Sequence, residues 1–154
     1  MNIHIFNPEH DIALAADSIF WTAPHAGRQL RADLGWLPVL WANDGDYVLV
    51  DDVPAARNAV RKLKRPIDDV RFVTLRQLAS VDKIDAVMPW GWDWSIVHTL
   101  ERHGIARNLM PSDECLATIR SISDRCTAAR LLVALREAFP ATCGEACAAY
   151  SVEE

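Results

Sequence analysis

Residues 6–11 carry more chemically active side chains than a simple turn requires. This segment holds an amide, two carboxylates and an imidazole, supplied by Asn7, Glu9, Asp11 and His10. Because Pro8 cannot donate a hydrogen bond to a sheet, the apolar strand expected at residues 3–6 must end there. Ligands bind at the carboxyl ends of strands in open α/β sheets. We therefore predict that these side chains contact a substrate, although a polar turn bonded to its own backbone is the simpler alternative.

The side chains of this segment suit several kinds of ligand. Glu9 and Asp11 can bind a cation, a substrate amine or a sugar hydroxyl, and His10 can donate, accept or ligate. A metal ion held by these three residues together with His25 is a weaker hypothesis, because adjacent loop residues of mixed ligand type do not converge on one ion by default. We therefore predict substrate binding here and no metal site.

A second group of candidates lies at residues 22–29, where a helix is expected to begin. Thr22 has the residue type preferred at a helix N-cap, and Pro24 suits the first turn. The free N–H groups and the dipole of a helix N-terminus favour an anion. His25 and Arg28 are the candidate substrate contacts, and Arg28 can clamp a carboxylate or phosphate through two hydrogen bonds. Alternatively, Arg28 pairs with a carboxylate of residues 6–11 and holds that segment shut.

A third group follows the apolar strand expected at residues 84–88. Two tryptophans around a glycine at the end of a parallel strand can build an aromatic wall beside the first segment. The predicted substrate contacts in this wall are Trp90, Gly91 and Asp93. An alternative places the tryptophans of residues 90–94 in the core or in a subunit interface. Asp93 also suits the N-cap of the helix that follows.

The pattern of apolar segments predicts an α/β fold. Strands are expected at residues 3–6, 38–41, 47–50, 70–73 and 84–88. The helices between them are expected at residues 22–34, 54–63 and 94–103, and Leu30 and Leu34 are spaced to face the sheet. This alternation is typical of a Rossmann-like, three-layer domain with a mostly parallel sheet of about five strands. Two C-terminal helices, at residues 111–122 and 124–138, follow the sheet.

Composition limits the classes of partner. The 154 residues include 16 basic and 21 acidic side chains, and the resulting net charge of −5 opposes binding to nucleic acid. No apolar run approaches the ~20 residues that span a bilayer, so no membrane contact is predicted. The first residues lack the pattern of a signal peptide, and the four cysteines do not resemble a secreted disulfide framework. We expect a cytoplasmic protein that binds a small-molecule substrate.

Several stretches resemble the N-terminal part of ATP-grasp proteins, which begin with a Rossmann-like pre-ATP-grasp domain. Residues 109–112 and 123–132 look like the segment that leads from that domain to the ATP-binding lobes, although Asp124-Arg125 stands where the family has Asp-Lys. The segments FNPEHDIALA and TAPHAGRQLR look like those of uncharacterised bacterial proteins of this type. The resemblance implies a pre-ATP-grasp domain at 1–110, a helical transition at 111–139 and the start of a further lobe at 140–154.

The resemblance also implies an activity. ATP-grasp enzymes join a carboxylate to an amine through an acyl-phosphate, with ATP and magnesium held in the two lobes. We expect this chain to hold no cofactor itself, to be inactive alone and to shape the substrate side of a larger site. One alternative is a small hydrolase or lyase with His10 or His25 as general base and Glu9 or Asp11 as its orienter. Another is a non-catalytic interaction module with a tryptophan-lined homodimer face.

Overall fold

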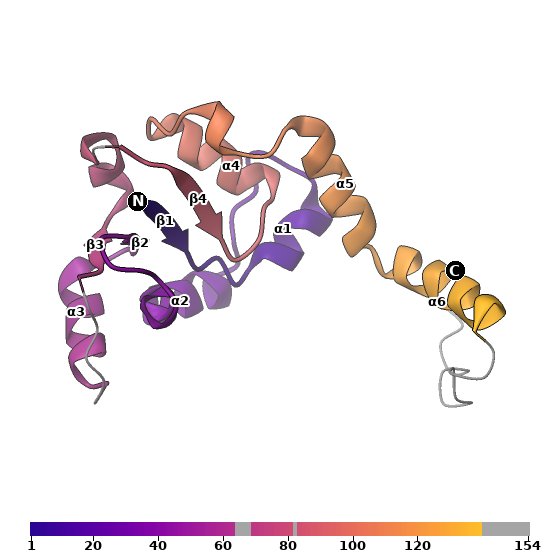
Figure 1. Ribbon diagram of the computed structural model, residues 1–154, viewed down its shortest axis with the longest axis horizontal. Coiled ribbons are helices and arrows are strands. Elements are labelled where there is room, and N and C mark those ends of the chain that lie inside the picture. Colours follow the sequence, from indigo (N-terminus) through magenta and orange to yellow (C-terminus); the bar gives the residue numbers. More distant parts are fainter. Residues whose placement is uncertain (64–68, 82, 140–154) are drawn as a thin grey trace.

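The computed structural model describes residues 1–63, 69–81 and 83–139, and these form a four-stranded parallel sheet (Figure 1). The strands are β1 (Asn2–Ile5), β2 (Tyr47–Leu49), β3 (Arg71–Val73) and β4 (Ala86–Pro89). They are ordered β3-β2-β1-β4, so the chain crosses from β3 at one edge to β4 at the other. The predicted α/β class with a parallel sheet is confirmed, with β1 at its centre.

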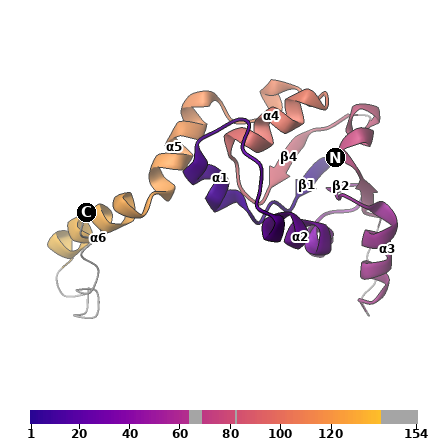
Figure 2. The same ribbon diagram turned by 180° about the vertical axis from the view of Figure 1, so that it is seen from behind.

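Helices lie on both faces of the sheet (Figures 1 and 2). The α-helices are α1 (His10–Ala16), α2 (His25–Leu34), α3 (Val53–Arg61), α4 (Trp94–Arg102), α5 (Asp113–Ser123) and α6 (Arg125–Ala138). Short 3₁₀ turns occur at η1 (Leu37–Leu40), η2 (Leu75–Ser80) and η3 (Arg107–Leu109). Both views place α4 on one face and α2 and α3 on the other, which gives three layers.

Alternating strand residues build a core on each face of the sheet. Ile3 and Ile5 of β1 point to the face where Leu100 of α4 packs. Val48 of β2 points to the opposite face and packs with Ala56 of α3. Ile3, Val48 and Leu100 are completely buried, which contributes about 1.5–3 kcal/mol for each side chain. Because both faces are covered, the central strand is held in place from two sides, and the loops at its carboxyl end start from a rigid base.

The strand expected at residues 38–41 is wrong. The chain forms η1 there, with hydrogen bonds from the Val39 N–H to Trp36 O (3.0 Å) and from the Trp41 N–H to Pro38 O (3.1 Å). Pro38 favours this turn because its φ suits the first helical position and it has no N–H to leave unpaired. Val39 is buried, whereas Trp41 is 50% exposed. A short apolar run does not distinguish a strand from a helical turn by composition alone.

The predicted start and packing of α2 also need correction. The helix begins at His25 with Pro24 as its N-cap, so Thr22 lies outside it. Leu30 is 43% exposed and does not face the sheet as predicted. None of the ten residues that the structure describes in α2 is fully buried. α2 therefore covers the sheet edge loosely, which leaves room for a pocket beneath it.

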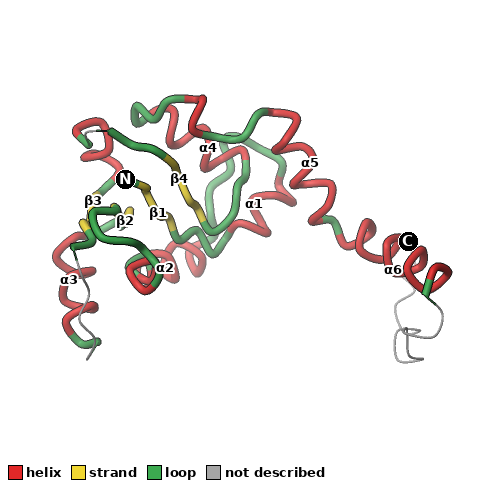
Figure 3. The backbone as a smooth tube through the Cα atoms, viewed as in Figure 1, coloured by secondary structure: helices red, strands yellow, loops and turns green. Residues whose placement is uncertain are grey.

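Polar caps set the starts of the last two helices. The Ser112 hydroxyl accepts a hydrogen bond from the Cys115 N–H (3.2 Å) at α5, and the Asp124 carboxylate accepts one from the Cys126 N–H (2.8 Å) at α6. α6 follows the end of α5 and extends away from the sheet (Figure 3). Residues 140–154, which the resemblance assigns to a further lobe, lie outside the described residues.

Among the described helices, none combines the length and apolar character needed to cross a bilayer.

A buried His4–Asp46 pair joins the start of β1 to the turn before β2. The His4 Nε2 lies 3.0 Å from the Asp46 Oδ2. Asp46 also accepts hydrogen bonds from the backbone N–H groups of Asn2 (2.7 Å) and Asn43 (3.1 Å). Burial opposes ionisation of this carboxyl, but the hydrogen bonds outweigh it and lower the pKa of Asp46 from 3.8 to about 2.

We expect the Asp46 carboxylate to stabilise the fold above pH 3.8 and to lose this contribution as the pH falls to about 2. The unfolded chain binds a proton in that window while the folded chain does not, so acid favours unfolding. Asp46→Asn should remove this part of the pH dependence of the free energy of unfolding. Urea denaturation between about pH 2 and 6 measures it, and an unchanged pH profile in the variant would contradict the assignment.

Candidate functional site

A pocket of about 200 Å³ opens at the carboxyl ends of β1 and β2. One wall is formed by α2 and the segment before it, and the other by the first turns of α4. The polar part of its lining comes from Asn7, Glu9, Thr22, Arg28, Arg31, Asp51, Asp93, Ser95 and Thr99. Phe6, Trp21 and Ile96 contribute apolar surface. The pocket lies at the edge where a parallel sheet presents its ligand-binding loops.

Asn7 ties the loop after β1 to the loop after β4. Its Nδ2 donates a hydrogen bond to Gly91 O at 2.8 Å, and the Gly91 N–H donates one to its Oδ1 at 3.2 Å. Both halves of the amide are therefore used, and the side chain is almost completely buried. Asn7 lines the pocket, but these two bonds make it a positioning residue that fixes the loop on which Glu9 lies.

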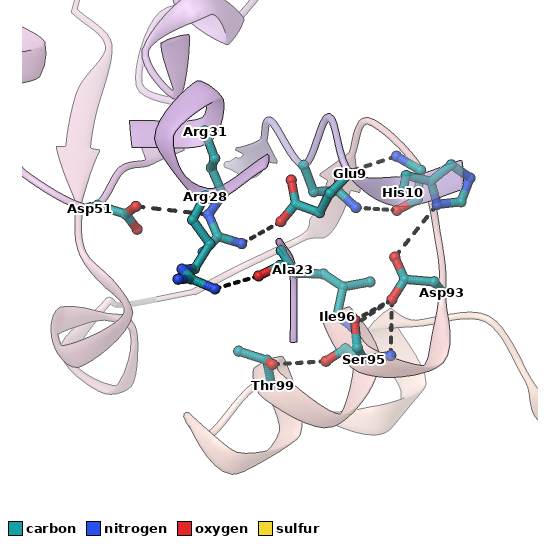
Figure 4. A network of polar contacts seen from close by, with 12 residues as sticks. Glu9, His10, Ala23, Arg28, Arg31, Asp51, Asp93, Ser95, Ile96 and Thr99 are labelled. Atoms are coloured by element: carbon teal, nitrogen blue, oxygen red, sulfur yellow. Dashed lines mark hydrogen bonds and ion pairs between the residues drawn. The ribbon is translucent and has the colours of Figure 1, made fainter. Parts of the chain in front are cut away.

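Glu9 and Arg31, both of which line the pocket, form an ion pair in which only the Glu9 side chain is buried (Figure 4). The Arg31 Nη1 lies 2.6 Å from the Glu9 Oε1, and Glu9 is 7% exposed. The second carboxylate oxygen, Oε2, is buried and accepts no hydrogen bond from the described residues. The Arg31 Nε is also buried without an acceptor there, since the Asp51 Oδ2 is 3.8 Å away. Unpaired buried polar atoms are costly, and a bound ligand or water usually satisfies them.

Arg28 does not have the partner that the sequence suggested. Its Nη1 donates to the backbone oxygen of Ala23, and Glu9 is paired with Arg31 instead. The hypothesis that Arg28 holds the loop shut through Glu9 or Asp11 is therefore wrong for the described contacts. Arg28 remains a pocket residue, largely exposed at the rim.

Asp93 caps α4 as predicted. Its Oδ1 accepts hydrogen bonds from the N–H groups of Ser95 (2.9 Å) and Ile96 (3.0 Å) and from the Ser95 hydroxyl (2.6 Å). Burial opposes ionisation of this carboxyl, but these bonds and the nearby His10 ring outweigh it and lower the pKa of Asp93 below its ordinary value. Asp93 is therefore a fixed negative charge in the wall of the pocket.

His10 packs against Gly91 and beside Asp93. The His10 Nδ1 lies 3.5 Å from the Asp93 Oδ2. A Cβ added to Gly91 would lie 2.2 Å from the His10 Cδ2, so only glycine allows the ring to sit there. The carboxylate beside His10 is thus Asp93, and not Glu9 or Asp11 as the sequence suggested for an orienter. Gly91 serves the packing of His10 and the bond to Asn7.

The predicted site residues Asp11, His25 and Trp90 do not line this pocket. Asp11 and His25 are exposed. Trp90 is 63% exposed and meets the Phe6 ring edge-on at a centroid distance of 5.6 Å. Trp92 packs against the core instead. Trp90 therefore lies beside residues 6–11 as predicted, but the aromatic side chains that line the pocket are Phe6 and Trp21.

The pocket residues that were not among the sequence-based candidates include Trp21, Arg31, Asp51 and Thr99. Arg31 lies three residues after Arg28, so the two side chains share a helix face. The prediction for Arg28 could therefore have been extended to Arg31. Asp51 follows the second strand of the sheet, at the edge where Asn7 and Glu9 follow the first. Trp21 lies in a connecting segment, and no periodic pattern identifies it.

Within the described ranges, no group of three or more histidine, cysteine, aspartate or glutamate side chains is placed to hold a metal ion. The sequence matches no family model, no curated protein and no solved structure. The function of this pocket must therefore be argued from its own chemistry.

Proposed function

We propose that this chain is the substrate-binding domain of an ATP-grasp-type ligase, with the substrate held in the pocket between α2 and α4. The observation that carries the proposal is the Glu9–Arg31 pair. The Glu9 carboxylate is buried in the pocket lining, yet its Oε2 has no hydrogen-bond partner among the described residues, and the nearest acceptor to the Arg31 Nε is the Asp51 Oδ2, 3.8 Å away. A pair needed only for stability would be expected to use these atoms internally, because unpaired ones cost free energy.

The ligase part of the proposal rests on the sequence resemblance and on the order of the elements. In the resemblance, the Asp124-Arg125 pair opens the helix that leads to the ATP-binding lobes. Here Asp124 caps α6, which carries Leu131 and Val133 at 58% and 56% exposure. Large exposed apolar side chains on a helix are suited to packing against another domain.

ATP and magnesium do not fit this pocket. The pocket is small, its Glu9 carboxylate is engaged by Arg31, and the sequence has no glycine-rich phosphate loop. The proposal therefore assigns the nucleotide to the lobes of a complete enzyme. It assigns only the binding and orientation of the substrate to this chain.

The test is to incubate the chain with a panel of small metabolites, with and without magnesium and ATP. Its melting temperature and the consumption of each compound are measured. We expect a binding compound to raise the melting temperature equally in both conditions, since only the folded state binds it, and to remain unconsumed. Turnover of a compound without ATP would contradict the proposal.

One observation favours a second candidate, a small hydrolase or lyase. The Asp93 carboxylate lies beside the His10 ring, as an orienting group lies beside a general base. Activity of this chain alone that is abolished in His10→Ala would support that candidate over the ligase. A tryptophan-lined dimer face is less well supported, because a pocket lies beside Glu9 and Trp92 packs on the core.

A further inference from the structure

Two opposite charges in the lining of the pocket are not balanced by their neighbours, and they indicate the class of ligand. We infer that the pocket takes a zwitterionic amino acid, whose ammonium group binds the Asp51 carboxylate and whose carboxylate binds the Arg28 guanidinium. This inference rests on the proposed function, because such a compound carries both of the groups that a carboxylate–amine ligase uses.

The negative charge comes from an imbalance around Arg31. Its Nη1 lies 2.6 Å from the Glu9 Oε1, and its Nε lies 3.8 Å from the Asp51 Oδ2. Two carboxylates thus face one guanidinium, so the three side chains together carry one excess negative charge. Glu9 is buried, whereas the Asp51 side chain is 49% exposed, so Asp51 is the carboxylate that a ligand can reach. Among the described residues, none donates a hydrogen bond to Asp51, which leaves it open to the three donors of an ammonium group.

The positive charge is that of Arg28. Its Nη1 donates to the backbone oxygen of Ala23, and no carboxylate of the described residues pairs with its guanidinium. Arg28 is exposed and lines the pocket, so its other N–H groups can be reached by a ligand. A guanidinium binds a carboxylate through two parallel, charge-assisted hydrogen bonds. Arg28 is therefore suited to hold the carboxylate of a ligand whose ammonium group lies toward Asp51.

The two charges face the pocket from neighbouring elements. Arg28 and Arg31 lie side by side on α2, because residues three apart are about ~5–6 Å apart at Cβ on a helix surface. Asp51 follows β2 and faces Arg31, as Figure 4 shows. One small molecule that reaches from Arg28 to Asp51 thus has to cross only about one turn of α2. An α-amino acid carries its two charged groups on one carbon, and β- and γ-amino acids carry them further apart.

The rest of the lining agrees with a ligand that is zwitterionic. The fifth charged residue, Asp93, directs its Oδ1 to the first turn of α4 and its Oδ2 toward His10, so it is already engaged. A ligand with a single charge would balance one end of the pocket and partly desolvate the other end without a partner, which costs free energy. A zwitterion balances both ends.

The apolar lining suits the carbon atoms of a small amino acid. Trp21 is half-buried and contributes an aromatic side chain to the pocket, with Phe6 and Ile96 as further apolar surface. Ligand pockets commonly combine such surfaces with a few polar groups that fix the orientation of the ligand. The volume of about 200 Å³ suits a compound smaller than a drug-sized ligand.

The test is saturation-transfer NMR on the whole chain, with amino acids and with compounds that lack one of their two charged groups. L-Alanine and β-alanine are compared with ethylamine and propionate, L-valine with isobutylamine and 3-methylbutanoate, and γ-aminobutyrate with propylamine and butanoate. We expect at least one amino acid to bind about tenfold or more tightly than its matched amine and its matched acid, the difference typical of one hydrogen-bonded charged group.

Two variants assign the ends of the ligand. Arg28→Gln should weaken binding of the amino acid about tenfold and leave the weaker binding of its amine unchanged. Asp51→Asn should weaken binding of the amino acid and of the amine, and leave that of the acid unchanged. A general loss of structure would not give this pattern, and each variant decides the question if the other does not fold. Arg57→Gln and Asp44→Asn are matched controls, because both remove an exposed charge that does not line the pocket; binding should be unchanged.

Three results would overturn this inference. They are binding of a matched amine or acid as tight as that of the amino acid, amino-acid binding that is unchanged in both folded variants, and the absence of binding by every amino acid. None of these results decides the proposed function, which is tested separately by the broader metabolite panel and by turnover without ATP.

Discussion

Arg31→Met is expected to lower the free energy of unfolding by about 2–3 kcal/mol, because it leaves the Glu9 carboxylate buried without a counter-charge. This expected loss is smaller than the ~3–5 kcal/mol for breaking a fully buried pair, because the Arg31 side chain is 35% exposed and water already screens the interaction in part. Methionine keeps the apolar stem of the arginine and removes only the guanidinium. Denaturation with urea measures the loss directly.

The Glu9–Arg31 interaction can be separated from the other effects of the substitution by a double-mutant cycle. Glu9→Gln combined with Arg31→Met should cost less than the sum of the single changes by about 1 kcal/mol or more, because the double variant buries no unpaired charge. The same cycle on the half-exposed Glu101–Arg107 pair, at 3.2 Å, should yield less than about 1 kcal/mol. Additive losses at Glu9 and Arg31 would show that the two side chains are not coupled.

Gly91→Ala is expected to destabilise the chain by about 1–3 kcal/mol, the range for inserting an extra carbon where atoms are already in contact. The new Cβ would lie 2.2 Å from the Cδ2 and 2.3 Å from the Cγ of His10. The ring must therefore move away from Asp93, or the loop must shift and weaken the two bonds to Asn7. Thermal and urea denaturation measure the loss.

The chain offers a matched control and a rescue for this substitution. Gly27 lies inside α2, and a Cβ there would be 3.3 Å from the Glu9 Cβ. Gly27→Ala should be close to neutral, because the small steric shift is offset by the ~0.5–1 kcal/mol gained when alanine replaces glycine in a helix. His10→Ala should relieve the clash, so the double variant with Gly91→Ala should cost less than the two single losses together. A loss in Gly91→Ala that His10→Ala leaves unchanged would contradict the packing described here.

The parts of the fold that the sequence predicted are those fixed by local chemistry. Pro8 ended β1, and Asp93 capped α4. The prediction of a strand at residues 38–41 was wrong because Pro38 and two apolar neighbours fit a 3₁₀ turn as well as a strand. Local signals do not say which of two geometries the surrounding packing selects.

The candidate site was predicted in its location but not in its pairings. Residues 6–11 and 90–93 do meet, through Asn7 and Gly91. Which arginine reaches Glu9 depends on how α2 is rotated against the sheet, and Leu30, expected to face the sheet, is 43% exposed. That rotation brings Arg31 rather than Arg28 to the carboxylate. It is a tertiary property that the spacing of residues along one helix does not determine.

The central claim is that the pocket lined by Glu9 and Arg31 binds a small substrate. It is tested most directly by ¹⁵N NMR, which maps the chemical-shift changes that a ligand causes at backbone amides. The wild-type chain is titrated with whichever small metabolite raises its melting temperature most. The account predicts that the largest shifts occur at Asn7, Gly35 and Ser95, which surround the pocket. Glu9→Gln should reduce these shifts at the same ligand concentration. Shifts confined to the exposed Trp90 or to α6, or no metabolite that binds, would contradict the account.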